Sequence, residues 1–226
     1  MWAIIKKEVK SYFLSPVGYI FIGLFLAMCS VFFYLDVVNY GSIQFENMFF
    51  STTTILTFII PILTMRIFAE ERKVGTEQLL YTSPRSMTSI VLGKFFATTF
   101  VIIITEICTL FYLGILYFFG TPHLQTIFVT LLGFLMLSMA YISFGMFASS
   151  ITENQIIAGV ITIGFFIITW FLPSFSEIFT PLSLINMFNK FPSGLIAIEE
   201  IVTYITFTIS FIILTMIVLQ RRKSIK

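Results

Sequence analysis

The densest group of ionisable side chains lies in the stretch FAEERKVGTEQLLYTSPRS, which runs from Phe68 to Ser86. Five charged residues fall within eight positions of it: Glu70, Glu71, Arg72, Lys73 and Glu77. Interleaved carboxylates and cations can form charge-assisted hydrogen bonds with another protein. Together with the adjacent Leu79 and Leu80 they suit docking into a groove of a soluble partner. The alternative is a solvated loop whose leucines rest on a membrane surface.

Small residues predict how this stretch folds. Gly75 can end one short helix, because glycine tolerates the left-handed geometry of a C-terminal cap. Thr76 can then act as the N-cap of a second helix, with Glu77 in its first turn. Pro84 stops that helix. The pattern therefore predicts two short helices separated at Gly75.

Motifs for catalysis, nucleotide binding and metal binding are absent from the sequence. The pair Gly93-Lys94 is followed by Phe95 and lacks the upstream glycine of a phosphate-binding loop. Histidine, cysteine and carboxylate residues show no metal spacing, and G-x-S-x-G is missing. Cys29 and Cys108 lie in apolar runs and are predicted to be small core residues. We expect no catalytic residue, no metal ligand and no cofactor in this chain.

Composition excludes a soluble domain. Hydrophobic residues make up 58% of the chain, charged residues 11%, and the mean hydropathy is +1.01, whereas a soluble domain carries roughly 25% charged residues. The net charge of +2 gives no argument for nucleic-acid binding. Apolar runs of about the length that a bilayer requires predict an all-α membrane protein with six transmembrane helices. The predicted spans are Val17–Leu35, Met48–Met65, Phe95–Phe119, Leu124–Ser149, Gln155–Leu172 and Ile201–Leu219.

Basic residues predict the orientation of the spans. Twelve of the 13 Lys and Arg residues lie before the first span, between the second and third, or after the sixth, and Lys190 is the exception. The positive-inside rule places the side with many basic residues in the cytoplasm. We therefore expect a multi-pass protein of the inner (cytoplasmic) membrane with both termini in the cytoplasm.

Three segments outside the spans complete the single membrane domain predicted for residues 1–226. Residues 1–15 have an apolar helical face and predict an interfacial helix on the cytoplasmic leaflet, which Ser15-Pro16 would end. Residues 66–88 form the cytoplasmic loop that contains the charge cluster. Residues 173–200, interrupted by prolines, predict short re-entrant helices in the outer half of the membrane.

The run FAEERKVGTEQLLYTSPRSMTSIVLGKF is similar to the cytoplasmic signature of ABC-2 type transporter permeases. The matching positions are Glu70, Glu71, Arg72, Gly75, Thr76, Leu79, Leu80, Pro84, Gly93, Lys94 and Phe95. Glu77 and Gln78 depart from it, because the family often has an apolar residue and an acid there. The run IIKKEVKSYFLSPVGYI resembles the gliding-motility subgroup. The outer segment resembles the last outer loop of the family, with Ser193 where a basic residue is usual.

This resemblance implies a coupling function. Such permeases pair with a second copy or a sister permease, and the pair docks two separate ATPase subunits that hold ATP and Mg. The loop then transmits closure of the ATPase dimer to the spans. Glu70, Glu71 and Arg72 would contact the ATPase. Leu79 and Leu80 would seat a coupling helix shaped by Gly75, Thr76 and Pro84.

Polar residues inside the spans are candidates for a translocation path. Thr53, Thr57 and Thr64 fall on one face of the second span, and Thr162 and Thr169 lie seven apart in the fifth. The resemblance places these two spans beside the cleft between protomers. The alternative is that the threonines bond carbonyls of their own helices.

Glu106 lies near the middle of the third span. An unpaired carboxylate there costs on the order of 3 kcal/mol or more, so we expect a protonated or hydrogen-bonded structural role rather than a substrate contact. Gly145 with Ser149, and Gly23 with Ala27, are pairs of small residues that could close helix interfaces.

Three functions are compatible with the sequence. The first is the membrane subunit of an ATP-driven exporter. The second is a gradient-driven channel or carrier, which the scarcity of charges inside the spans disfavours. The third is a membrane anchor or mechanotransmitter whose ATPase acts on an envelope complex.

Overall fold

A computed structural model describes residues 1–39, 41, 44–78, 86–175, 180 and 183–225, and these residues form helices, turns and connections without a strand. Within this part of the chain, six helical segments are long and apolar enough to cross a membrane. The prediction of an all-α protein with six spans is confirmed. The observed spans are Pro16–Val37, Phe45–Lys73, Met87–Leu116, Leu124–Ile151, Gln155–Ser174 and Ile198–Lys223.

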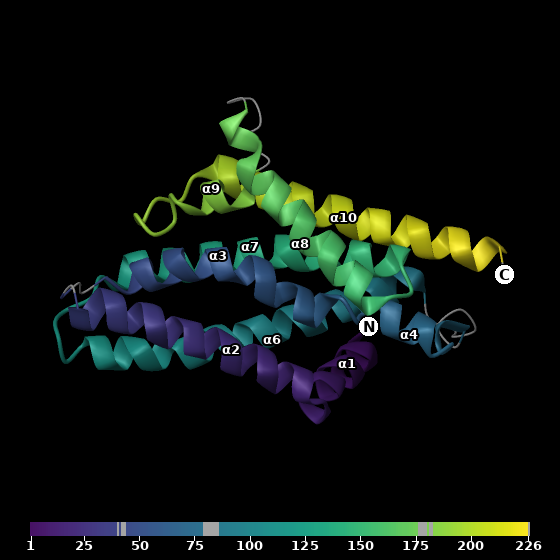
Figure 1. Cartoon of the computed structure of the whole chain (residues 1–226), viewed down its shortest axis with the longest axis horizontal. Helices are drawn as coiled ribbons and strands as arrows, with labels where there is room; N and C mark the ends of the chain where they lie inside the picture. Colours follow the sequence, from purple (N-terminus) through teal and green to yellow (C-terminus); the bar gives the residue numbers. More distant parts are fainter. Residues whose placement is uncertain (40, 42–43, 79–85, 176–179, 181–182, 226) are drawn as a thin grey trace.

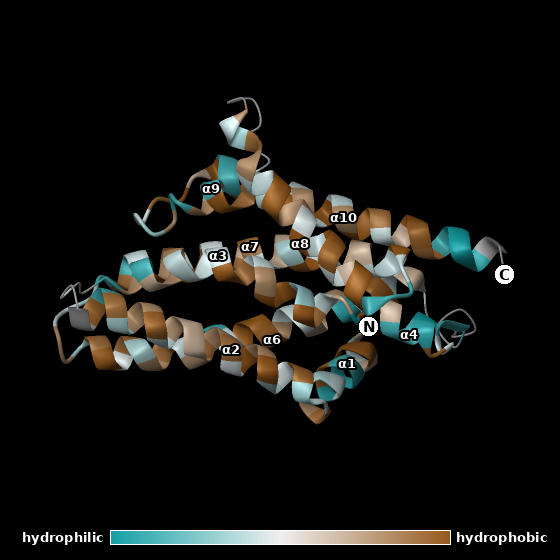
Figure 2. Cartoon of the chain, viewed as in Figure 1, coloured by the Kyte–Doolittle hydropathy of each residue, from teal (hydrophilic) through white to brown (hydrophobic). Residues whose placement is uncertain are grey.

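The helices form an elongated bundle in which both termini and α4 lie at the same end, on the right of Figure 1. Figure 2 shows hydrophilic residues at this end, on α1, α4 and the last turns of α10. We call it the basic end, after Lys6, Lys7, Lys10, Arg66, Arg72, Lys73, Arg221, Arg222 and Lys223. The elements are α1 (Trp2–Leu14), α2 (Pro16–Phe33), η1 (Tyr34–Asn39), α3 (Phe45–Thr64), α4 (Ala69–Lys73), α6 (Met87–Leu116), α7 (Leu124–Ile151), α8 (Gln155–Phe171), η2 (Leu172–Ser174), α9 (Leu184–Phe188) and α10 (Ile198–Ile225).

Local sequence explains several helix boundaries. Ser15 is extended and Pro16 is the first residue of α2, so the predicted break between α1 and the first span is confirmed. The hydroxyl of Ser86 accepts a hydrogen bond from the backbone N–H of Ser89 at the start of α6. The side chain of Asn154 caps α8 in the same way, through the N–H of Ile156.

Helix α7 is the centre of the bundle and packs against α3, α6, α8 and α10. Its interface with α8 contains Tyr141 stacked on Phe166, with ring centroids 3.8 Å apart. Gly145 of α7 packs on Thr64 of α3, so the predicted small-residue interface at Gly145 is confirmed. Cys29 is buried but Cys108 is exposed on the outside of the chain, so the prediction that both are core residues is wrong for Cys108.

Short helices occur in the predicted outer segment, as expected, and α9 is packed into the bundle. Phe191 is fully buried and its ring lies over Gly133 of α7, where an added Cβ would come within 2.3 Å of it. The hydroxyl of Tyr204 in α10 donates to the carbonyl oxygen of Leu184 in α9 at 2.7 Å. These contacts hold α9 and the turn that follows it against α7 and α10.

Candidate functional site

The predicted coupling stretch begins as a direct continuation of α3. A turn over residues 65–68 joins α3 to α4, and α4 ends at Lys73. Gly75 has a φ of 80°, the left-handed geometry that was predicted for a helix end there. Glu77 and Gln78 are again helical. The predicted contact residues Leu79, Leu80 and Pro84 lie outside the described residues.

Ser149 of α7 fastens the start of α4. Its hydroxyl oxygen accepts hydrogen bonds from the backbone N–H groups of Phe68 and Ala69, at 3.0 and 3.1 Å, and donates to the carbonyl of Met65 at 3.0 Å. The first amides of a helix have no partner within the helix itself. Ser149 therefore supplies from another helix the cap that α4 lacks in its own sequence.

Arg72 fastens the other end of α4 to the C-terminus of α7. Its guanidinium donates to the carbonyls of Ser150 at 2.7 Å and Thr152 at 3.0 Å, and forms an ion pair with Glu77 at 3.3 Å. The last carbonyls of a helix are unpaired and carry partial negative charge, so an arginine stabilises them. Arg222 of α10 donates to the adjacent carbonyl of Ile151. Both arginines thus cap α7.

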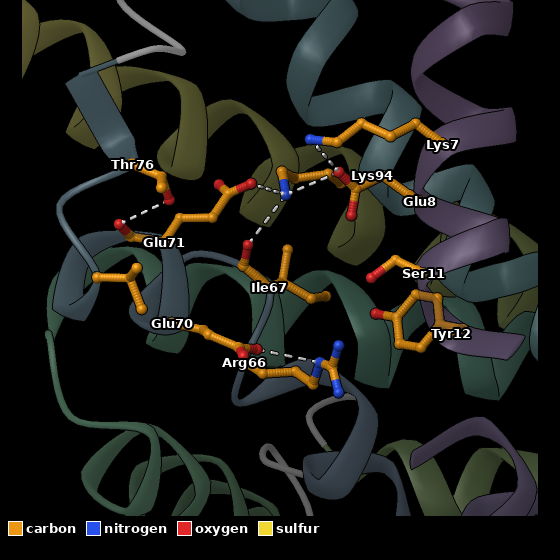
Figure 3. Close-up of a pocket in the computed structure, with 11 residues that line it drawn as sticks. Lys7, Glu8, Ser11, Tyr12, Arg66, Ile67, Glu70, Glu71, Thr76 and Lys94 are labelled. Carbon is orange, nitrogen blue, oxygen red and sulfur yellow. Dashed lines mark hydrogen bonds and ion pairs between the residues drawn. The ribbon is translucent and has the colours of Figure 1, made fainter. Parts of the chain in front are cut away.

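Lys94 of α6 joins α4 to α1. Its ammonium donates to the Glu71 carboxylate at 2.8 Å, to the Glu8 carboxylate at 3.2 Å and to the carbonyl of Ile67 at 3.1 Å (Figure 3). The side chain is only 3% exposed. A buried ammonium is stable only when it is paired in this way. The cluster therefore links three elements that are distant in sequence.

Further contacts pack α1 against α3 and α6. The Tyr12 hydroxyl, whose pKa is raised by burial, donates to the carbonyl of Leu63 at 3.2 Å and lies 3.0 Å from the Thr98 hydroxyl. Ile4 packs directly on Gly93, where a Cβ would come within 2.8 Å of its side chain. Movement of the α3–α4 turn must therefore disturb α1 as well.

A polar pocket of about 250 Å³ lies between α1 and the α3–α4 turn. Figure 3 shows charged residues of both signs around it. Arg66 pairs with Glu70, and Lys7 pairs with Glu8 at the other side. The second oxygen of Glu71, Oε2, is buried without a hydrogen-bond partner among the described residues. The lining is Lys7, Glu8, Ser11, Tyr12, Arg66, Ile67, Glu70, Glu71, Val74, Thr76 and Lys94.

The predicted ATPase-contact residues divide into an inner and an outer set. Arg72 is 8% exposed and its contacts are within the chain. Glu71 is partly buried, and its backbone carbonyl accepts a hydrogen bond from the Thr76 hydroxyl. The residues that directly follow α4 are exposed; Val74, for example, is 69% exposed. Of the predicted contact residues, Gly75 and Thr76 are exposed and Glu70 is half-exposed. Together with Lys73, Val74 and Gln78, which are exposed but were not predicted as contacts, they form the exposed outer set of the described loop.

The five candidate path threonines lie in the packed interior of the single chain. Each of the five threonines is at most 4% exposed. Thr57 lies 3.4 Å from the Tyr141 hydroxyl of α7. The other four hydroxyls donate to carbonyls of their own helices, which is the alternative role for membrane threonines. These are Thr53 to Phe50, Thr64 to Ile60, Thr162 to Ala158, and Thr169 to Phe166.

Glu106 of α6 is 9% exposed, and its Oε1 atom is buried without a hydrogen-bond partner in the described part of the chain. The backbone carbonyl of Glu106 accepts a hydrogen bond from the Thr109 hydroxyl. Among the described residues the carboxyl group of Glu106 forms no ion pair, and its protonated or hydrogen-bonded structural role stays a prediction.

Three residues that build the site were not singled out for this role from the sequence. The sequence marks Lys94 only as a position of the family signature and as one of the basic residues that predict the orientation, and Glu8 only as one of several charges on an amphipathic helix. Ser149 belongs to a pair of small residues. Their partners lie 23 to 86 positions away in the chain, and no local pattern connects such residues.

The fold and the site define a multi-pass helical membrane protein with a folded loop fixed to one end of its bundle. The family model described as ABC-2 family transporter protein matches residues 34–220. The chain therefore belongs to the ABC-2 transporter family and is the permease component of an ABC transporter, a component that lacks an ATPase site of its own. A comparison with curated proteins gave no match.

Proposed function

We propose that this permease works in an ATP-driven exporter and couples ATP hydrolysis by two copies of a separate ATPase subunit to export. ATP and Mg belong to that subunit. The permease pairs with a second copy or with a sister permease in the inner membrane, and its basic end faces the cytoplasm. We also propose that the chain belongs to the gliding-motility subgroup of these permeases, which its N-terminal run resembles.

One observation carries the proposal: the α3–α4 turn and α4 are bonded at both ends to the transmembrane helices. Ser149 holds the first amides of α4, Arg72 caps α7, and Lys94 ties Glu71 to α6 and α1. A loop that only rested on a membrane surface would not need buried, charge-assisted bonds to three helices. A loop that transmits force requires such connections, because a displacement of α4 must reach α7 and α6.

The exposed outer set is the surface that we assign to the ATPase. Val74 offers apolar area, and Lys73 and Glu70 offer charges of both signs. The Glu71 side chain is 19% exposed beside the polar pocket, and we assign it to the edge of this contact, where a basic side chain of the partner would complement its charge. In this proposal Arg72 transmits the movement to α7, Glu70 and Glu71 contact the ATPase, and Leu79 and Leu80 seat the coupling helix that the sequence predicts.

Copurification with a soluble ATPase encoded next to this chain, followed by an ATPase assay in lipid, tests the proposal. V74D should weaken copurification because it places a charge in the apolar contact. R72M should keep copurification but reduce stimulation of the ATPase, because the link to α7 is lost. Gly23 faces open space far from the loop in sequence, so G23A is the matched control. Full stimulation by both V74D and R72M would contradict the coupling assignment.

The same assay separates export from mechanotransmission. Stimulation of the ATPase by a transported substrate in lipid supports the exporter. An ATPase that binds the permease tightly but responds only to an envelope protein supports the mechanotransmitter. If no ATPase binds, both functions are excluded.

A further inference from the structure

A groove of about 590 Å³ runs along the outer side of α1, between this helix and α6. It is separate from the polar pocket, which lies on the opposite side of α1. Its volume is within the range of about 300–1,000 Å³ that is usual for small-molecule sites. The lining residues are Trp2, Ile5, Lys6, Val9, Lys10, Phe13 and Phe100.

The lining combines an apolar floor with a cationic rim. Val9 and Phe13 of α1 and Phe100 of α6 are hydrocarbon, whereas Lys6 and Lys10 stand four residues apart on the same face of α1. Both lysines are exposed, and within the described part of the chain neither pairs with a carboxylate. Two free ammonium groups above an apolar cleft match an anionic headgroup above an acyl chain.

The position of the groove agrees with this chemistry. Helix α1 immediately precedes the first span, and Phe100 lies inside the third span, which is observed at Met87–Leu116. The groove therefore reaches from the membrane surface into the hydrocarbon. Trp2 at its mouth is a residue type that is enriched at membrane–water interfaces.

The groove is preformed, because the other side of α1 is fixed to the bundle. Ile4 packs on Gly93, Glu8 accepts from Lys94, and Tyr12 donates to Leu63. A ligand entering the groove does not have to order the helix, which favours specific binding over a loose surface association.

We propose that this groove binds an anionic phospholipid of the leaflet at the basic end. The phosphate lies between Lys6 and Lys10, and one acyl chain follows Val9 and Phe13 to Phe100. A bound lipid would add to the contacts of Glu8 and Tyr12 that already hold α1 against the bundle. The inference concerns this chain and its membrane, and it does not depend on the proposed ATPase.

Tryptophan fluorescence of the full-length chain provides the test. The chain has two tryptophans, so W170F leaves Trp2 at the groove as the reporter. The protein is placed in phosphatidylcholine vesicles with increasing mole fractions of phosphatidylglycerol that carries brominated acyl chains, which quench nearby tryptophan. Brominated phosphatidylcholine in place of the brominated phosphatidylglycerol gives the comparison.

We expect phosphatidylglycerol to quench Trp2 at mole fractions about thirty-fold lower than phosphatidylcholine, since each of the two lysines contributes a factor of about five. K6Q combined with K10Q should abolish this preference. K7Q should retain it, because Lys7 pairs with Glu8 and lines the polar pocket. Equal quenching by both lipids, or a preference that survives K6Q/K10Q, would overturn the proposal.

F100A tests the apolar part independently of the lysines. It should weaken quenching by phosphatidylglycerol about tenfold and leave the headgroup preference intact. Unchanged quenching in F100A would mean that the lipid binds α1 alone and not the groove. Displacement of the brominated lipid by soluble glycerol 1-phosphate would show that a free anion suffices, and would also overturn the assignment.

Discussion

The ammonium of Lys94 lies 2.8 Å from the carboxylate of Glu71 and joins α6, the helix of the third span, to α4. The same ammonium lies 3.2 Å from Glu8 in the N-terminal helix. One buried cation thus makes α1, α4 and α6 parts of a single unit. Because the two carboxylates are 19% and 16% exposed while Lys94 is 3% exposed, the lysine is the member of the cluster whose loss costs most.

K94M should therefore lower the free energy of unfolding by about 2–3 kcal/mol, because two carboxylates lose their cation in a poorly solvated site. The value is measured by denaturant or detergent titration of the purified chain. E71Q and E8Q combined with K94M should restore part of the loss, since the uncompensated charges are then removed. K73M is the control, because Lys73 is exposed and forms no ion pair with a carboxylate among the described residues. Equal destabilisation by K73M and K94M would contradict the role of Lys94 in linking α1, α4 and α6.

S149A should loosen the start of α4. The variant removes the acceptor of the Phe68 and Ala69 amides and should cost about 1–2 kcal/mol locally. Hydrogen exchange of these two amides should become faster, while that of the α7 interior stays unchanged. S150A is a matched control, because the Ser150 hydroxyl donates only to the carbonyl of Phe147 in its own helix. If both variants exchange alike, Ser149 is not the cap of α4.

Most of the fold could be predicted from the sequence, and the reason lies in the solvent. A hydrocarbon environment forces each apolar run into a helix. Ser15-Pro16 and Gly75 are local signals that also gave correct boundaries. The contacts of the site could not be predicted in the same way, because the hydrogen bonds of Lys94 and Ser149 join residues that are far apart in the sequence. Cys108 shows a further limit: an apolar run does not tell which of its faces meets lipid.

The sequence also did not indicate which charged side chains of the loop face the bundle and which face outward. The charge pattern from Glu70 to Glu77 predicts contacts with a partner protein. The guanidinium of Arg72 instead donates hydrogen bonds to the carbonyls of Ser150 and Thr152 within the chain. The carbonyls at the end of α7 attract this arginine, and no pattern in residues 68–86 indicates which helix end lies beside them.

R72K tests whether the geometry of Arg72 matters beyond its charge. A lysine ammonium cannot reach the carbonyls of Ser150 and Thr152 and the Glu77 carboxylate together, as the planar guanidinium does. We expect R72K to lower the unfolding free energy by about 1–2 kcal/mol and to reduce stimulation of the ATPase. R222K removes one bond, to Ile151 at the same helix end, and should have the smaller effect. An R72K variant that behaves like the wild type would assign the arginine a purely electrostatic role.

G145A tests the close contact between α7 and α3. An added Cβ would lie 2.2 Å from the Thr64 hydroxyl oxygen and 2.6 Å from the Thr64 Cβ, so the two helices must separate. Overpacking of this kind costs on the order of 1–3 kcal/mol. G23A, at a glycine with nothing within 4 Å, should be neutral or slightly stabilising. Thermal unfolding of the two variants in the same detergent provides the comparison, and a lower midpoint for G23A than for G145A would contradict the packing.

E106Q addresses the one carboxyl that the described contacts leave unpaired within the third span. The amide has nearly the same shape and is neutral, so a structural role for an uncharged Glu106 predicts unchanged thermal unfolding and unchanged ATPase stimulation in lipid. E106K, which forces a charge into the same site, should lower the stability by about 3 kcal/mol. Loss of ATPase stimulation in E106Q at full stability would have a different meaning. The carboxyl would then be needed as an acceptor or a charge by a substrate or by the second permease copy, because no ion pair within the described chain uses its Oε1 atom.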